Sequence, residues 1–255
     1  MKARGFLIDL DGVLYTGDRA IPGAQETIRF LQEQNCPFRC VSNSTRKCRS
    51  TIAQRLAKMG IEIPESFIFT PPLAAMKYIT GTGKNRLYLL TTGDVVRDFS
   101  SLCSLDDQEN VDYVIVGDAG DRLNYGTLNR AFRHLLSGAE LIALEKDRFW
   151  MAPDGLSLSA GPFVAALEYA AGTTARVMGK PAKDFFSLAL HDMGLIPHEA
   201  AMIGDDIATD IGGAQQAGLA GILVKTGKFR KDTLMQSNIM PDAVIGSIAN
   251  LKEIM

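Results

Sequence analysis

Residues 4–12 read Arg-Gly-Phe-Leu-Ile-Asp-Leu-Asp-Gly, a short apolar run that ends in two carboxylates and a glycine. Such a run predicts a strand that is buried on both faces, and Asp-Gly predicts a turn where the strand ends. A second apolar strand is predicted at residues 200–203 and is followed by Gly204-Asp205-Asp206. Each of these two strands is therefore expected to carry acidic side chains at its carboxyl end.

Strands and helices alternate in both terminal parts of the chain. Apolar residues at helical spacing predict a helix within residues 22–35, and a strand is predicted at residues 38–41. The cap-forming run Ser42-Asn43-Ser44-Thr45 predicts that the next helix begins at once. The C-terminal part is predicted to hold helices at residues 183–193 and 211–217, strands at residues 200–203, 221–225 and 243–245, and a terminal helix. Parallel neighbours need crossover connections, so this pattern indicates an α/β fold.

The middle of the chain carries a strand and helix series of its own, which we interpret as an inserted domain over residues 75–176. Residues 1–74 and 177–255 then form a discontinuous core domain. Within the insert, strands are predicted at residues 87–91, 113–116 and 141–144, and helices at residues 128–136 and 163–171.

Composition excludes several classes of protein. A chain of 255 residues with 46% hydrophobic residues can bury one or two ordinary cores. Its formal net charge of −2 gives no reason to expect nucleic acid or an anionic membrane as a partner. No window approaches the roughly 18 apolar residues of a membrane span, and we expect a cytoplasmic protein. The four cysteines lack the spacing of a zinc site or a disulfide framework and are expected to be free thiols: Cys36, Cys40, Cys48 and Cys103.

Acidic and hydroxyl side chains gather where the predicted parallel strands end, which is where open α/β sheets bind ligands. They are Asp9, Asp11, Ser42, Asp205 and Asp206. Carboxylates crowded at one edge repel one another unless a cation lies among them. Hard oxygen ligands favour Mg²⁺, and such a site suits phosphoryl transfer.

The residue types match the steps of such a reaction. Asp9 can attack phosphorus, and Asp11 can protonate the leaving oxygen and later accept a proton from water. Lys180 supplies a positive charge, while Ser42 and the main-chain N–H of Asn43 at a helix start can donate to a phosphate oxygen. Taken singly, each residue has a commoner structural explanation as a turn, a helix cap or a surface lysine. Their joint order favours the catalytic interpretation.

Four ordered motifs resemble those of the haloacid dehalogenase (HAD) superfamily: Asp9-Leu10-Asp11-Gly12-Val13-Leu14, Ser42-Asn43, Gly179-Lys180-Pro181, and Gly204-Asp205-Asp206 with Asp210. The resemblance spans the whole chain. It implies a Rossmann-like, doubly wound parallel sheet core, and an α/β cap inserted between the second and third motifs, as in the NagD and 4-nitrophenyl phosphatase enzymes. Residues 154–169, 212–215 and 223–228 are similar to the branch of haloacid dehalogenase-like hydrolase domain-containing protein 2 and phospholysine phosphohistidine inorganic pyrophosphate phosphatase.

The resemblance also implies a role for each motif residue. Asp9 is expected to be the nucleophile and Asp11 the acid/base. The remaining roles are Mg²⁺ binding by Asp9, Asp205 and the main-chain carbonyl of Asp11, phosphate binding by Ser42, Asn43 and Lys180, and support of the metal or the lysine by Asp206 and Asp210. Where NagD-like caps carry Asn-Pro-Asp, this chain has Glu145-Lys146-Asp147, so NagD-like substrate preferences are not expected.

The leading hypothesis is a Mg²⁺-dependent phosphatase that acts on a small phosphorylated metabolite, whether a phosphate ester, a phosphoamide or pyrophosphate. Two alternatives stay open at this point: a receiver-like phosphoacceptor, and a non-catalytic metabolite-binding protein of the same fold. A homodimer joined through the caps would fit the resemblance. The sequence does not rank the substrates.

Overall fold

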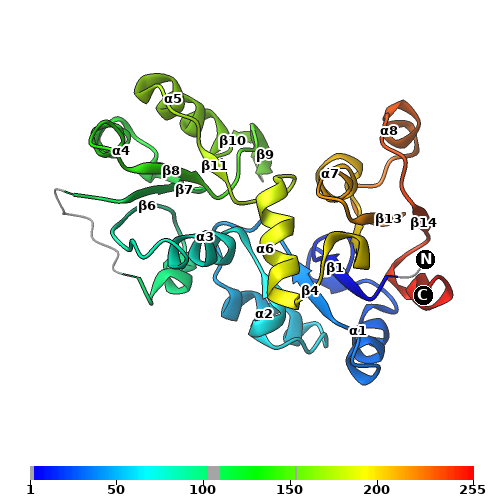
Figure 1. The fold of residues 1–255 in the computed structure, drawn as a ribbon. Helices are drawn as coiled ribbons and strands as arrows, with labels where there is room; N and C mark the ends of the chain where they lie inside the picture. Colours follow the sequence, from blue (N-terminus) through cyan, green and yellow to red (C-terminus); the bar gives the residue numbers. More distant parts are fainter. Residues whose placement is uncertain (1–2, 103–109, 153) are drawn as a thin grey trace. The chain divides into compact units, whose positions relative to one another are not determined.

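The computed structural model describes residues 3–102, 110–152 and 154–255, so Cys103 lies outside the described residues. The chain divides into two compact units, which we describe separately (Figure 1). The first unit comprises Met1–Ser42, Arg49–Phe69 and Lys180–Met255, and the second comprises Asn43–Cys48 and Thr70–Gly179. The predicted α/β class is confirmed, whereas the predicted limits of core and cap stay predictions.

The first unit is built on a six-stranded parallel sheet in the order β14-β13-β12-β1-β4-β5. Its strands are β1 (Gly5–Asp9), β4 (Phe38–Val41), β5 (Ile68–Phe69), β12 (Ala200–Gly204), β13 (Ala220–Val224) and β14 (Ala243–Ile245). Ile8 of β1 lies opposite Ile203 of β12 and Cys40 of β4. The strand order reverses between β1 and β12, so the predicted acidic turns end adjacent strands at the point where such sheets bind ligands.

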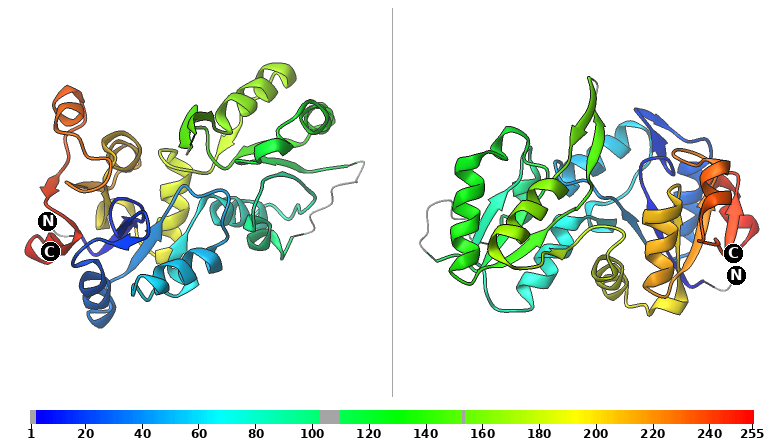
Figure 2. Two further views of the ribbon diagram at one scale, coloured as in Figure 1. Left: turned by 180° about the vertical axis from the view of Figure 1, so that it is seen from behind. Right: turned by 90° about the horizontal axis from the view of Figure 1, so that it is seen from above.

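Helices cover both faces of this sheet (Figures 1 and 2). They are α1 (Ala24–Glu33), α2 (Arg49–Lys58), α6 (Lys183–Met193), α7 (Gly213–Gln216) and α8 (Lys231–Gln236). The unit also contains the π-helical turn η5 (Ile207–Gly212) and the 3-10 turns η1 (Glu65–Phe67), η4 (Pro197–Glu199) and η6 (Ile248–Glu253). A small antiparallel ribbon is formed by β2 (Tyr15–Thr16) and β3 (Arg19–Ala20). Ile8 packs in one buried cluster with residues of α1 and α2. On the other face, Leu223 packs with Ile211 of η5, and the ring of Phe69 meets Phe185 of α6 at 5.4 Å. This is the doubly wound arrangement that the sequence predicted.

The helix predicted directly after residues 42–45 is present, but it begins only at Arg49, so its predicted start is wrong. Residues 43–48 form an irregular segment within the second unit. There, Thr45 Oγ1 accepts a hydrogen bond of 3.2 Å from the Asp118 N–H, and the Cys48 N–H donates at 2.8 Å to Asp94. These long-range bonds satisfy the segment's polar groups outside a helix, which overrides the local capping preference.

In the C-terminal part, some observed elements differ from the predicted ones. The helix predicted at residues 211–217 begins instead at Ile207 as a π-helical turn, because Asp206 Oδ1 accepts from the N–H groups of Ala208 and Thr209, each at 3.0 Å. The predicted terminal helix is the 3-10 turn η6. Within α6, Phe185 and Phe186 are buried, whereas Leu188 is only partly buried.

The second unit has a four-stranded parallel sheet in the order β11-β8-β7-β6, with a separate antiparallel hairpin. Its elements are α3 (Pro71–Thr80), β6 (Leu87–Leu90), η2 (Val95–Phe99), β7 (Tyr113–Val116), η3 (Gly120–Arg122), α4 (Tyr125–Leu136), β8 (Glu140–Ala143), β9 (Phe149–Ala152), β10 (Gly155–Leu158), α5 (Gly161–Ala171) and β11 (Arg176–Val177). The three predicted strands and two predicted helices are present, while α3, β11 and the hairpin were not predicted. In the part of the chain that the structure describes, no helix is long and apolar enough to cross a membrane.

Glu145, which follows β8, organises the loop that leads from this strand. Its buried carboxylate accepts from Ser159 Oγ at 2.6 Å, from the Ala160 N–H at 2.9 Å and from the Asp147 N–H at 2.5 Å. Burial raises the pKa of Glu145, although these three hydrogen bonds oppose the shift. Glu145, which belongs to the Glu145-Lys146-Asp147 sequence found in place of Asn-Pro-Asp, thus ties the loop to the start of α5.

Glu145→Ala is expected to lower the free energy of unfolding by about 2–3 kcal/mol, because it leaves two buried donors and one partly buried donor without an acceptor. Urea unfolding followed by circular dichroism would measure the change. Lys146→Ala is the matched control, since the neighbouring side chain is exposed and its loss should change stability little. Equal effects of the two substitutions would contradict this explanation of the loop.

Candidate active site

Lys180 lies between two carboxylates of the first unit. Its ammonium Nζ is 2.7 Å from Asp9 Oδ1 and 2.7 Å from Asp210 Oδ1, and only 5% of the side chain is exposed. Asp9 ends β1, Asp210 lies in η5 just after β12, and Lys180 precedes α6. Three segments that are distant in the sequence thus each place one charged group at the switch point of the sheet. This arrangement brings the Lys180 ammonium group next to the Asp9 carboxylate.

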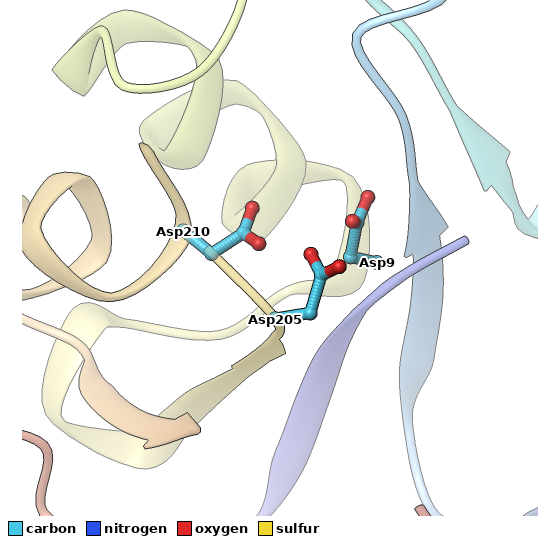
Figure 3. Close-up of side chains that lie close together, drawn as sticks. All are labelled: Asp9, Asp205 and Asp210. Atoms are coloured by element: carbon cyan, nitrogen blue, oxygen red, sulfur yellow. The ribbon is translucent and has the colours of Figure 1, made fainter. Parts of the chain in front are cut away.

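A third carboxylate completes the cluster. One oxygen each from Asp9, Asp205 and Asp210 lies within 4.8 Å of the others, and the three side chains converge from β1 and from the segment after β12 (Figure 3). The metal ligands expected from the resemblance were Asp9, Asp205 and the main-chain carbonyl of Asp11. The exposed side chain of Asp11 does not belong to this group of carboxylates, whereas that of Asp210 does. A role for Asp11 stays a prediction.

The charges in this cluster are not balanced by the protein groups alone. Three carboxylates face one ammonium group, which leaves a charge of −2 when all are ionised. Asp205 Oδ2 accepts a hydrogen bond from the Lys228 N–H at 2.7 Å, but Asp205 Oδ1 is buried and has no hydrogen-bond partner among the described residues. A buried oxygen of this kind is costly unless a cation or a donor meets it. The donor set therefore fits a hard divalent cation.

Burial dominates the proton affinities of the cluster. It raises the pKa of Asp9 against the opposing attraction of Lys180, and it raises the pKa of Asp210 to about 6. The pKa of Asp205 is also raised by burial, although the Lys228 N–H opposes the shift. For Lys180, burial alone would lower the pKa, but Asp210 and Asp9 together raise it, so the ammonium group stays charged. Burial thus disfavours the ionised form of these three carboxylates, and a bound cation would offset their negative charge.

Gly204, the last residue of β12, leaves room for Asp210. A Cβ atom at position 204 would overlap the Cβ and carboxylate of Asp210, which also accepts from the Asp206 N–H at 3.1 Å. A larger residue at this position must displace the carboxylate that holds Lys180.

We expect Gly204→Ala to lower the free energy of unfolding by about 1–3 kcal/mol and to weaken catalysis. The physical reason is overpacking against the backbone-proximal atoms of Asp210, which cannot swing away as a flexible side-chain end could. Thermal unfolding and initial rates would measure both effects. In Gly126→Ala, the matched control in α4, the new Cβ would meet no atom closer than 3.4 Å, so stability should stay the same or rise slightly.

The other predicted site residues are placed as follows. Ser42 directly follows Val41, which lies opposite Asp9, so Ser42 is at the same edge of the sheet. Asn43 belongs to the second unit and is described only there. Asp206 caps η5, and its Oδ2 is 3.9 Å from the Lys228 ammonium. Their roles in phosphate or metal binding stay predictions.

The segment after β13 was not predicted as part of the site. Besides the bond from the Lys228 N–H to Asp205, the Thr226 hydroxyl donates to the main-chain carbonyl of Gly12 at 2.5 Å. In the sequence, these residues are notable only for their resemblance to one branch of the superfamily. The signal that could have identified them as site residues is their position just after β13, the strand next to β12.

Fold and site together define an α/β enzyme with a buried acidic centre at the switch point of a doubly wound sheet. Models of haloacid dehalogenase-like hydrolases match residues 6–102 and 177–251 of the chain. The chain is 44% identical, over 89% of its length and 86% of the relative's, to haloacid dehalogenase-like hydrolase domain-containing protein 2 of Bos taurus. It is 36% identical, over 99% and 94%, to the human phospholysine phosphohistidine inorganic pyrophosphate phosphatase.

Among solved structures, the p-nitrophenyl phosphatase from Archaeoglobus fulgidus superposes with a TM-score of 0.91 at 27% identity and 100% coverage of both chains. The chain belongs to the haloacid dehalogenase-like hydrolase family, and within it the chain is an enzyme of the phosphatase type. The predicted resemblance and the predicted core with a cap are confirmed. The family is one of hydrolases, which argues against a receiver-like phosphoacceptor and a non-catalytic binding protein.

Proposed function

We propose that the chain hydrolyses a small phosphorylated metabolite through an aspartyl phosphate on Asp9, with a Mg²⁺ ion at the acidic cluster. The observation that carries this proposal is the pairing of Asp9 with the buried Lys180 ammonium, beside an Asp205 oxygen that has no partner among the described residues. Asp9 and Asp205 would hold the ion, and Asp210 would hold Lys180. A bound Mg²⁺ ion supplies positive charge that offsets the phosphoryl oxygens.

The chain's own residues account for the steps. A carboxylate oxygen of Asp9 forms a bond to phosphorus while the bond from phosphorus to the leaving group breaks, and Asp11 gives the leaving group a proton. Water then attacks the same phosphorus, Asp11 takes a proton from that water, and inorganic phosphate leaves Asp9. Lys180 holds Asp9 in one orientation and contributes positive charge near the phosphoryl group. Ser42, at the same edge of the sheet, would donate to a phosphate oxygen.

The comparisons support several bond types as substrates. The human relative's name describes action on phospholysine, phosphohistidine and inorganic pyrophosphate, and the A. fulgidus protein is called a p-nitrophenyl phosphatase. We therefore include phosphoamides and pyrophosphate with phosphate monoesters in the proposed substrate class. Relative kcat/KM values over a panel of these compounds would identify the preferred bond.

Removal of the metal ion is expected to lower the rate of 4-nitrophenyl phosphate hydrolysis by at least about 100-fold, because a metal ion contributes several kcal/mol of charge stabilisation. Initial rates would be compared after treatment with EDTA and after dialysis back into Mg²⁺. The same activity in both conditions would contradict the proposed metal site. Recovery in Mg²⁺ is the control that separates metal loss from irreversible unfolding.

A further inference from the structure

The segment Thr226-Gly227-Lys228 connects the two acidic turns of the first unit. At one end, the Thr226 hydroxyl donates to the carbonyl oxygen of Gly12, in the turn after β1, at 2.5 Å. At the other end, the Lys228 N–H donates to Asp205 Oδ2, in the turn after β12, at 2.7 Å. Two hydrogen bonds from three consecutive residues thus join the turn that follows the nucleophile to a carboxylate of the acidic cluster.

The contact is close enough to require glycine on both sides. Gly12 has φ of 83° and Gly227 has φ of 62°, a region that other residues rarely adopt. A Cβ atom on either glycine would overlap Asp205 Oδ2, and a Cβ atom on Gly227 would lie 2.5 Å from the Cα atom of Gly12. The segment therefore has almost no freedom to shift while Asp205 keeps its position.

We propose that residues 226–228, which we call the strap, position Asp205 as a ligand for a divalent cation. The strap holds Oδ2 on a main-chain amide, which fixes the rotation of the carboxylate and leaves the buried Oδ1 for the cation. Its bond to the carbonyl of Gly12 sets the distance between Asp205 and the turn that follows Asp9 and carries Asp11. Groups that hold a metal ligand in this way commonly change metal affinity by about 10–100-fold when they are removed. The inference rests on the metal site of the proposed function.

Thr226→Val tests the strap because valine keeps the shape of threonine and removes only the hydroxyl donor. Mg²⁺ would be titrated by calorimetry into metal-free protein without substrate. We expect Thr226→Val to weaken Mg²⁺ binding at least about 10-fold, and Thr226→Ser, which keeps the hydroxyl, to stay within about threefold of the parent protein. The Mg²⁺ concentration that gives half-maximal turnover should rise in parallel, with a smaller change in kcat at saturating Mg²⁺.

Two further variants make the outcome decisive. Lys231→Ala, at an exposed position just beyond the strap, should bind Mg²⁺ as the parent does. Asp205→Asn should lose binding. If Asp205→Asn binds normally, the proposed metal site is wrong and the strap proposal fails with it. If Asp205→Asn loses binding but Thr226→Val does not, or if Thr226→Ser is as weak as Thr226→Val, only the strap proposal is overturned.

Thermal unfolding in EDTA would show whether each variant is folded before metal is added. Should Thr226→Val not fold, Gly227→Ala provides the second test, because its Cβ would push the strap away from Asp205 Oδ2. Folded Gly227→Ala with unchanged Mg²⁺ affinity would also overturn the proposal.

Discussion

Asp9→Asn should lower kcat for 4-nitrophenyl phosphate by at least about 10³-fold, since loss of a nucleophile removes the first chemical step. An amide does not attack phosphorus as a carboxylate does, yet it has nearly the same shape and its oxygen can still accept from Lys180. The variant should therefore keep its fold. Initial rates at saturating Mg²⁺ and thermal unfolding would separate the loss of catalysis from a loss of structure.

The phosphoenzyme gives an independent measurement. Acid quenching of the parent protein during turnover, followed by mass spectrometry of the peptides, should find a phosphoryl group on Asp9. The Asp9→Asn variant should carry none. Retention of more than about a tenth of the parent activity by this variant would rule out Asp9 as the nucleophile.

Lys180→Met should lower the free energy of unfolding by about 3–5 kcal/mol in metal-free buffer, because it leaves two buried carboxylates without their cation. Lys180 is the shared partner of Asp9 and Asp210, each at 2.7 Å, and methionine fills a similar volume without the charge. The expected loss is therefore electrostatic in origin. Urea unfolding at neutral pH in EDTA would measure it.

A surface ion pair supplies the matched control. Lys146 contacts Glu168 at the same distance of 2.7 Å, but 38% of its side chain is exposed, so Lys146→Met should cost no more than about 1 kcal/mol. Adding Asp210→Asn to Lys180→Met should recover part of the lost stability, because one uncompensated carboxylate is removed. Equal losses for the two lysine variants would show that burial does not make the Lys180 pair special.

The sequence predicted the elements whose residues are buried on both faces. The apolar runs of β1 and β12 are short and each ends in an acidic turn, so the position of Asp9 and Asp205 could be predicted from the ends of these strands. The pairing of Lys180 with Asp9 could be predicted only from the order of the motifs, since nothing near Lys180 in the sequence indicates that its side chain is buried.

Elements that depend on distant contacts could not be predicted in this way. Residues 43–48 have the local signature of a helix start, but bonds to Asp94 and Asp118 hold them in another conformation. In the hairpin, β9 is an unbroken apolar run without alternation, and the leucines that alternate in β10 are exposed instead of buried. The strap acts partly through a main-chain N–H, which every residue except proline has.

The position of β1 between β4 and β12 has a consequence for synthesis on the ribosome. β1 is made first, but its neighbour β12 is made only after residue 199 has been added. At about 5–20 residues per second, one edge of β1 in the nascent chain waits roughly 10–40 s for its partner. The second unit, whose strands all lie between residues 87 and 177, can form its own sheet during that interval. A polypeptide that is terminated before β12 is synthesised contains neither Asp205 nor Asp210, so it lacks two of the three carboxylates of the acidic cluster.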